Sequence, residues 1–158
     1  MTVAIRAATV GDVDAVVVLE RTIAEAPHWG REEYVRMLAD PAAAVRRVLL
    51  IAERDAAMVG FAVGKVIGSG EDAVGELESV AVAEDARRLG AGRALCEAVI
   101  GWCAAQGAAV VELEVRSGSE GARALYGSLG FVEVGVRAGY YRDPAEDAVL
   151  MNRVDRTA

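Results

Sequence analysis

Residues 78–93 read Glu-Ser-Val-Ala-Val-Ala-Glu-Asp-Ala-Arg-Arg-Leu-Gly-Ala-Gly-Arg and form the most informative stretch of this 158-residue chain. The first five residues predict the end of a β-strand. A loop follows that carries two glycines one residue apart, and an apolar helical stripe begins directly after it. Such a loop lets backbone N–H groups approach an anion closely, at the positive end of a helix dipole.

Three arginines, Arg87, Arg88 and Arg93, surround this loop. No Gly-Lys-Ser/Thr sequence follows, which argues against an ATP-binding P-loop, and the third glycine of the dinucleotide fingerprint is missing. Ordinary helix capping is the alternative explanation of the glycine pair. With a strand before it and arginines around it, we favour a cradle for a pyrophosphate group.

Strands and helices alternate on both sides of this loop. Strands are predicted over residues 3–8, 45–53, 58–67, 73–83, 109–115, 131–137 and 145–154, and helices from Gly11-Asp12 onward and over 31–38, 90–106 and 119–129. The strand, helix, strand order of the second half implies a crossover with local parallel pairing. We therefore expect residues 1–158 to form one α/β domain of mixed α+β type. A single twisted mixed sheet would be flanked by helices in the order β-α-α-β-β-β-α-β-α-β-β.

Composition narrows the functional classes. Seventeen basic and 24 acidic residues give a formal net charge of −7, which argues against a general nucleic-acid binder. His28 is the single histidine and no zinc-type cysteine pair is present, so we expect no metal site. Cys96 and Cys103 share an apolar helix face and are expected to pack in the core without a disulfide. The chain shows no signal-peptide pattern and no apolar run of membrane-spanning length, which predicts a cytoplasmic protein without membrane contact.

Residues 87–92, Arg-Arg-Leu-Gly-Ala-Gly, resemble the Arg/Gln-x-x-Gly-x-Gly/Ala motif with which GNAT acetyltransferases bind the pyrophosphate of acetyl-CoA. The predicted order of elements also matches the GNAT fold. Further segments are similar to the RimI-type branch, which acetylates the N-terminal alanine of a ribosomal protein: Leu-Glu-Val-Arg at 113–116, Ala-Leu-Tyr-Gly-Ser-Leu-Gly-Phe at 124–131, and Arg137 with Tyr-Tyr at 140–141 and Glu-Asp-Ala at 146–148. This resemblance covers nearly the whole chain and implies acetyl-CoA as co-substrate.

The resemblance also implies which residues hold acetyl-CoA. The backbone of Val80, Ala81 and Val82 would bond the pantetheine arm and the acetyl carbonyl. The pyrophosphate cradle would comprise Arg87, Arg88, Leu89, Gly90, Ala91, Gly92 and Arg93. Ser119 stands where the branch usually has asparagine, and we expect it to contact the pantetheine arm with altered geometry.

Acetyl transfer to an amine calls for a base, because only the neutral amine attacks a thioester and an α-amino group has a pKa near ~7.7–8.0. Along the strand at 109–115, Glu112 and Glu114 alternate with apolar residues, a pattern that by itself favours a solvated polar face. Glu114 matches the family's proton acceptor, and the resemblance makes it the first candidate. Glu76 and Glu78 on the neighbouring strand are the reserve candidates, and Glu112 is the weaker one.

Tyr126 matches the family's proton donor to the sulfur of coenzyme A and is also expected to contact the co-substrate. A phenol with a pKa of about 10 stays protonated at neutral pH and can donate a hydrogen bond. A core tyrosine packed beside Leu125 and Leu129 would produce the same pattern. Both descriptions hold if the ring packs while the hydroxyl faces the channel.

Aromatic residues before and after the sheet are candidates for an acceptor groove. Trp29, together with His28 and the loop at residues 26–30, would lie on one side of it and Tyr140 and Tyr141 on the other, with Glu78 also contacting the substrate. Trp29 could equally fasten the two short helices to the core. His28 is expected to be an exposed loop residue.

These expectations describe an acetyl-CoA-dependent N-acetyltransferase without a metal, acting as a monomer or homodimer. The expected acceptor is the N-terminal amine of a protein or peptide, such as a basic ribosomal protein, and not a nucleic acid. One alternative is a GNAT enzyme for a small amine, such as an amino acid, a polyamine or a drug. Another is a non-catalytic coenzyme-A-binding module.

Overall fold

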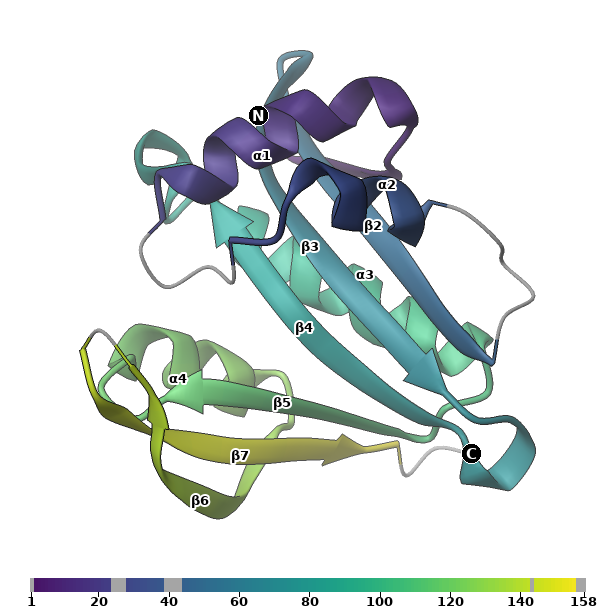
Figure 1. Cartoon of the computed structure of the whole chain (residues 1–158), viewed down its shortest axis with the longest axis vertical. Coiled ribbons are helices and arrows are strands. Elements are labelled where there is room, and N and C mark those ends of the chain that lie inside the picture. Colours follow the sequence, from purple (N-terminus) through teal and green to yellow (C-terminus); the bar gives the residue numbers. More distant parts are fainter. Residues whose placement is uncertain (1, 24–27, 39–43, 143, 156–158) are drawn as a thin grey trace.

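The computed structural model describes residues 2–23, 28–38, 44–142 and 144–155. A seven-stranded mixed sheet lies at its centre, in the order β1-β2-β3-β4-β5-β7-β6 (Figure 1). The strands are β1 Ala4–Ala7, β2 Val45–Arg54, β3 Ala57–Ile67, β4 Val74–Val82, β5 Val110–Arg116, β6 Val132–Tyr141 and β7 Glu146–Val154. The α-helices are α1 Val13–Arg21, α2 Arg31–Met37, α3 Ala91–Ala105 and α4 Glu120–Ser128. The predicted fold class and the predicted order of strands and α-helices are confirmed.

Strand β6 differs most from its prediction, since it extends to Tyr141 instead of ending at Arg137. A register shift between Arg137 and Tyr141 interrupts the pairing with β7, which resumes where Tyr141 pairs with Glu146. Gly139, at a φ of 61°, lies inside this irregular stretch and donates its N–H to the Asp147 carboxylate at 2.8 Å. Gly139 interrupts the alternation of apolar and polar residues along β6, which is why the sequence pattern ended the strand too early. Tyr140 and Tyr141 are the last two residues of the observed strand.

Each face of the sheet is covered by its own helices, α1 and α2 on one face and α3 on the other (Figure 1). The α3 residues Leu95, Cys96, Val99 and Cys103 are fully buried, as their helical spacing predicts. Burial of each such side chain contributes about 1.5–3 kcal/mol. Burial also raises the pKa of Cys96 to about 12 and of Cys103 to about 11, so these reduced thiols pack without reacting.

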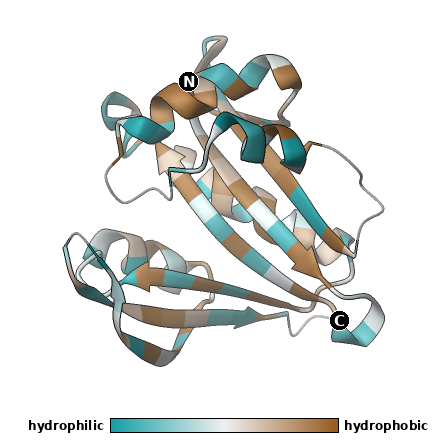
Figure 2. Ribbon diagram, in the orientation of Figure 1, coloured by the Kyte–Doolittle hydropathy of each residue, from teal (hydrophilic) through white to brown (hydrophobic). Residues whose placement is uncertain are grey.

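The opposite core joins Val13 and Val16 of α1 and Tyr34 of α2 to Ile51 and Phe61 of the sheet. Buried and less buried residues alternate along β4, which Figure 2 shows as alternating apolar and polar bands. Successive side chains of β4 therefore point to opposite faces of the sheet. In the described part of the chain, no helix combines the length and the apolar character that crossing a membrane requires.

Strands β4 and β5 pair only at their first residues, where Val74–Glu76 run parallel to residues 110–112. Beyond Glu76 the two strands diverge, which opens a wedge in the sheet (Figure 1). A β-bulge adds to the distortion: Val63 pairs with Ser79 and Gly64 with Leu77, which leaves Glu78 as the extra residue. Bulges bend a strand and re-aim its side chains. The edge of β4 from Leu77 to Val82 therefore has no neighbouring strand on the side of β5.

Candidate active site

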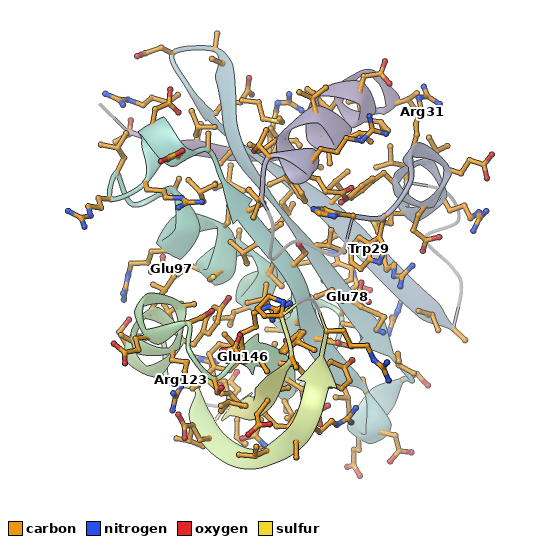
Figure 3. All side chains as sticks on the ribbon, turned by 60° about the vertical axis from the view of Figure 1, so that its left-hand side comes forward. Trp29, Arg31, Glu78, Glu97, Arg123 and Glu146 are labelled. Carbon is orange, nitrogen blue, oxygen red and sulfur yellow. The ribbon has the colours of Figure 1, made fainter. Side chains whose placement is uncertain are left out.

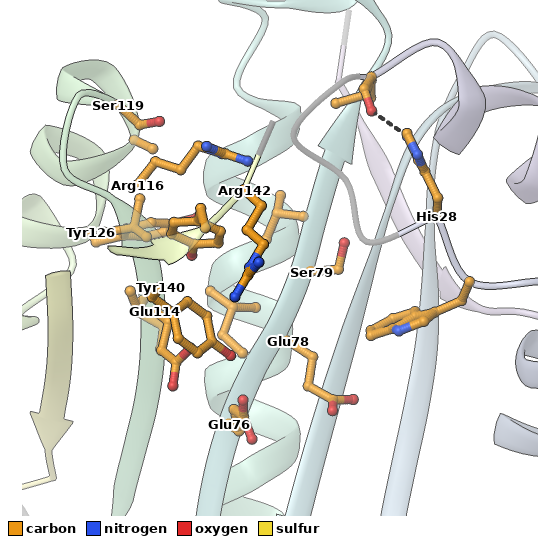
Figure 4. Close-up of a pocket in the computed structure, with 18 residues that line it drawn as sticks. His28, Glu76, Glu78, Ser79, Glu114, Arg116, Ser119, Tyr126, Tyr140 and Arg142 are labelled. Atoms are coloured by element: carbon orange, nitrogen blue, oxygen red, sulfur yellow. Dashed lines mark hydrogen bonds between the residues drawn. The ribbon is translucent and has the colours of Figure 1, made fainter. Parts of the chain in front are cut away.

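A pocket of about 750 Å³ occupies the wedge between β4 and β5 (Figure 4). Its walls come from β4, from β5 with α4, from the end of β6, and from the segment before α2. The lining residues are Ile23, His28, Trp29, Glu76, Leu77, Glu78, Ser79, Val80, Leu113, Glu114, Val115, Arg116, Ser119, Ala122, Tyr126, Tyr140, Tyr141 and Arg142. The structure thus brings together both predicted catalytic residues and all four predicted acceptor-groove residues.

Glu114 projects into the pocket from β5, between the buried Leu113 and Val115. Its side chain is 27% exposed and lies 3.5 Å from the Arg137 guanidinium. Hydrogen bonding to the Glu114 carboxylate raises the pKa of Tyr140 above its ordinary value. Glu112, two residues earlier, is exposed and lies outside the pocket. The solvated-face interpretation therefore describes Glu112 and not Glu114.

Glu78 and Glu76 end a row of ion pairs that crosses β2, β3 and β4, which we call the charge ladder (Glu33, Arg47, Glu78, Lys65 and Glu76). Arg47 lies 2.6 Å from Glu33 and 3.1 Å from Glu78, and Lys65 lies 3.2 Å from Glu78 and 3.1 Å from Glu76. The Glu78 side chain is only 8% exposed. Burial disfavours the charge of Lys65, but both glutamates outweigh it and raise its pKa. The Glu78 carboxylate is therefore held between two cations.

Tyr126 lies on α4 with its ring packed edge-to-face against Phe131, at a centroid distance of 6.0 Å. Burial raises the pKa of Tyr126 above its ordinary value, so the hydroxyl stays protonated at neutral pH. Among the described residues, no protein group forms a hydrogen bond with that hydroxyl. The ring is thus a packing element, while the hydroxyl is available to a ligand in the pocket.

Glu146 fastens the start of β7 to the loop before α4. Its carboxylate accepts hydrogen bonds from the Gly118 N–H at 2.5 Å, from Arg116 at 3.2 Å and from Ser117 Oγ at 3.4 Å. The Gly118 N–H and the Arg116 guanidinium lower the pKa of Glu146. Arg116 also covers the Tyr141 ring, 4.4 Å from its centroid. We call this arrangement the Glu146 clamp, and Glu146 is labelled in Figure 3. It connects the start of α4, at Ser119, to the pocket wall formed by Tyr140 and Tyr141, which we call the tyrosine wall.

Trp29 lines the pocket and also packs against the core, while residues 26 and 27 of the predicted groove loop lie outside the described residues. Its ring packs edge-to-face on Tyr34 at 5.9 Å, lies 6.0 Å from the Arg47 guanidinium, and lines the pocket. His28, at a φ of 57°, is exposed and donates a ring N–H to the Ile23 carbonyl oxygen at 2.8 Å. Across the pocket, Tyr140 and Tyr141 pack edge-to-face at 5.1 Å.

The glycine loop lies outside this pocket, at the start of α3. Gly90 adopts a left-handed conformation with a φ of 84°, and the first helical bond runs from the Ala94 N–H to the Gly90 carbonyl. The preceding N–H groups have no intrahelical acceptor and can bind an anion. A side chain at Gly92 would contact Val82 and Leu125 at 3.8 Å, so the loop adjoins both the end of β4 and α4.

The arginines of the loop divide into two groups. Arg87 and Arg88 are exposed, and neither forms an ion pair within the described residues. Arg93 instead pairs with Glu97 at 2.9 Å and donates to Ser128 Oγ at 3.0 Å. Arg87 and Arg88 together with the helix start therefore fit a pyrophosphate, and the unpaired edge of β4 leads from there toward Glu114.

Sequence reasoning assigned no site role to eight residues of the pocket wall: Ile23, Leu77, Ser79, Leu113, Val115, Arg116, Ala122 and Arg142. A signal existed only for the arginines, since one ends the Glu114 strand and the other directly follows the tyrosine pair. No cluster of three or more His, Cys, Asp or Glu residues that could hold a metal ion occurs in the described ranges.

A family model for acetyltransferases of the GNAT family matches residues 15–131. The chain belongs to the GNAT family. The ribosomal-protein-bS18-alanine N-acetyltransferase of Escherichia coli K12 is 46% identical to it over 77 residues, which are 48% of this chain and 52% of that enzyme. The chain thus spans about half the length of this GNAT relative.

Two longer matches support the same branch of the GNAT family. An N-alpha-acetyltransferase of Sulfurisphaera tokodaii is 34% identical over 156 residues, covering 93% of this chain and 90% of that protein. The crystal structure of the ribosomal-protein-S18-alanine N-acetyltransferase from Escherichia coli superposes with a TM-score of 0.81 at 29% identity, covering 99% and 96% of the two chains. The resemblance to RimI-type GNAT proteins is confirmed.

Proposed function

We propose that the protein is an acetyl-CoA-dependent N-acetyltransferase that modifies the N-terminal α-amine of a protein or peptide. The observation that carries the proposal is the meeting of Glu114 and Tyr126 in one pocket, beside the unpaired edge of β4. The Escherichia coli relative is a ribosomal-protein-alanine N-acetyltransferase and the Sulfurisphaera tokodaii relative an N-alpha-acetyltransferase, which supports this acceptor.

Acetyl-CoA supplies the acetyl group and a thiolate as leaving group. The N–H groups at the start of α3, with Arg87 and Arg88, would hold its pyrophosphate. The backbone of residues 80–82 would bond the pantetheine arm as a neighbouring strand would, and Ser119 would contact that arm from the start of α4. A backbone N–H of the same β4 edge, pointing at the thioester oxygen, would stabilise the negative charge that develops there.

Glu114 would accept the proton that the amine loses when it forms the amide bond, directly or through water. The Tyr140 hydroxyl and Arg137 would orient the carboxylate. Tyr126 would donate a hydrogen bond and then a proton to the departing sulfur, since its raised pKa keeps it protonated. No covalent intermediate on the protein is required, which agrees with two buried cysteines outside the pocket.

The acceptor would enter between Trp29 on one side and Tyr140 and Tyr141 on the other. A pocket of about 750 Å³ is at the larger end of the range of small-molecule sites, and it has room for an acetyl-bearing arm and the start of a peptide. These aromatic rings offer apolar walls with polar tips for a peptide backbone.

Mass spectrometry of peptides incubated with the protein and acetyl-CoA tests the proposal. Peptides with a free α-amine should gain one acetyl group at the N-terminus, whereas N-terminally blocked peptides that contain lysine should not. Transfer only to free amino acids or polyamines would favour a small-amine enzyme. Binding of coenzyme A without transfer to any amine would favour a binding module.

The co-substrate site is tested separately through the thermal midpoint, which acetyl-CoA should raise by binding only the native state. Gly90→Val should abolish this shift, because a β-branched residue is strained at a φ of 84° and would displace the loop. Gly101→Ala is the matched control, since Gly101 is an exposed glycine of α3 with open space around it. An unchanged shift in Gly90→Val, and in the double variant Arg87→Gln/Arg88→Gln, would exclude this loop from the site.

A further inference from the structure

The charged residues that line the pocket differ in whether they have a partner. Glu76 and Glu78 are paired within the charge ladder, and Glu114 lies 3.5 Å from Arg137. Arg116 is 15% exposed and held by Glu146 at 3.2 Å. Arg142 alone among the pocket's charged side chains forms no ion pair or hydrogen bond with any described residue.

Arg142 is placed to meet an incoming acceptor. It directly follows Tyr141 at the end of β6 and is exposed, and its side chain reaches into the pocket between the tyrosine wall and β4 (Figure 4). The guanidinium carries several N–H donors in a planar fork that matches a carboxylate. Because the Arg142 guanidinium is exposed at the mouth of the pocket, it stays hydrated in the free protein and can bind a carboxylate without first breaking a contact with another described residue.

The surroundings favour an anion over a second cation at this position. The three pocket glutamates lie on β4 and β5, and each already has a cation within ion-pair distance. Arg47 and Lys65 pair with Glu78, Lys65 also pairs with Glu76, and Arg137 pairs with Glu114. Among the described charged side chains of the pocket, Arg142 is therefore the one that has no counter-ion within ion-pair distance, which leaves its guanidinium open to a carboxylate. A lysine or arginine of the acceptor would be repelled there.

We propose that Arg142 binds a carboxylate of the acceptor and so selects substrates that carry an acidic group close to the acetylated amine. The inference rests on the proposed function, since it places the amine at Glu114. Two sources share this chemistry: the side chain of an aspartate or glutamate just after the N-terminal residue, and the α-carboxylate of a free amino acid.

Acetylation rates of matched acceptors test the selection. Three C-terminally amidated peptide sets would begin with alanine and differ only in Asp, Asn or Lys at the second or third residue. Alanine and alaninamide would test the free α-carboxylate. In whichever of the two series supplies the carboxylate that Arg142 binds, kcat/KM should be on the order of fivefold higher for the acceptor with the carboxylate than for the neutral one. The difference should arise mainly from KM. It should become smaller when salt is added.

Substitutions of Arg142 test whether this residue causes the preference for carboxylate-bearing acceptors. Arg142→Gln should remove the preference while acetylation of the Asn peptides persists, and Arg142→Glu should reverse it in favour of the Lys peptides. Arg21→Gln is the control, since Arg21 is an exposed arginine outside the pocket that likewise has no ion-pair partner among the described residues. It should retain the preference.

Two results would overturn the inference alone: equal rates for acidic and neutral acceptors with the unmodified protein, or a preference that survives in Arg142→Gln. Absence of transfer to every acceptor would instead overturn the proposed function, and this inference with it. The two failures are thus distinguishable in one set of assays.

Discussion

Glu78 on β4 and Glu114 on β5 line the same pocket from facing strands, but their surroundings are opposite. Glu78 is 8% exposed and has two cations within 3.2 Å, Arg47 and Lys65. Glu114 is 27% exposed, and its one ion-pair partner within the described ranges, Arg137, lies 3.5 Å away and is itself mostly solvated. The first carboxylate completes a charge network, whereas the second is only loosely held by its neighbours.

The two walls of the pocket, one formed by β4 and the other by β5 and the end of β6, differ in how firmly their charged residues are held, as these two glutamates do. The β4 wall belongs to a part of the sheet that helices cover on both faces, and its charges are fixed by the charge ladder. On the β5 wall, β6 is an edge strand whose Val132, Val134 and Val136 are exposed, and the Glu146 clamp holds the start of β7 in place. The comparison indicates that charges on the β4 wall are held in place by their partners, whereas Glu114 on the β5 wall is more solvated; this difference fits the proposed catalytic role of Glu114.

The largest expected effect is that of Glu114→Gln. Removing the base should lower kcat about a hundredfold or more, while acetyl-CoA affinity stays nearly unchanged. Raising the pH should recover part of the rate, because more of the amine is then neutral without help. Steady-state kinetics between pH 7 and 9 would measure this, with Glu112→Gln as the control on the same strand. Near-normal turnover of Glu114→Gln would transfer the role to the β4 wall.

Tyr126→Phe should lower kcat about tenfold or more and change the unfolding free energy by less than about 0.5 kcal/mol. The reason is that the hydroxyl has no partner in the described protein, so only the departing sulfur loses a donor. Tyr126→Ala should also destabilise the protein, by about 3 kcal/mol, because the ring packs on Phe131. Turnover and chemical denaturation on one preparation decide the matter. Full activity in Tyr126→Phe would leave sulfur protonation to water.

Glu78→Gln should affect the stability of the protein more than its turnover, whereas Glu114→Gln should affect turnover more than stability. We expect kcat to fall less than about threefold, and the free energy of unfolding to fall by about 1–3 kcal/mol, because Arg47 and Lys65 lose a buried anionic partner. Glu32→Gln is the control, since its ion pair with Arg36 lies on the surface and should contribute little. A collapse of turnover without loss of stability would mean that the β4 wall carries the base.

The smallest expected effect is the pH-dependent contribution of Glu146. Its pKa in the folded protein lies below the ordinary value of 4.5, so the ionised clamp stabilises the fold above that pH. The contribution should be lost as the pH falls from 4.5 through the lower, folded-state value. The thermal midpoint of Glu146→Gln should therefore lie below that of the unmodified protein at pH 7, and the difference should shrink in acid.

Glu71→Gln provides the baseline for that comparison, because Glu71 is exposed and forms no ion pair among the residues described. A constant difference between the unmodified protein and Glu146→Gln from pH 7 to pH 3 would show that the clamp acts through packing and not through charge.

Local periodicity was sufficient to predict most elements of this fold. The stripe of Leu95, Cys96, Val99 and Cys103 predicted α3, and the alternation along β5 predicted which residues are buried, because both depend on spacings of a few residues. The glycine pair predicted a loop at a helix start, and Gly90 adopts a left-handed conformation at that position. Resemblance to GNAT proteins, and not periodicity, selected Glu114 and Tyr126 from residues with an equally plausible structural role.

Tertiary structure alone decided how the pocket is formed. The bulge, in which Glu78 has no partner residue on β3, and the divergence of β4 from β5 both arise from pairing between strands. The register of that pairing cannot be read from the local sequence pattern. Glu78 and Glu114 sit in similar alternating sequences, and only the cations that β2, β3 and β6 bring to them set them apart. Arg142 likewise has no ion-pair partner among the described residues because the fold places no carboxylate of those residues within reach of it, which its local sequence does not reveal.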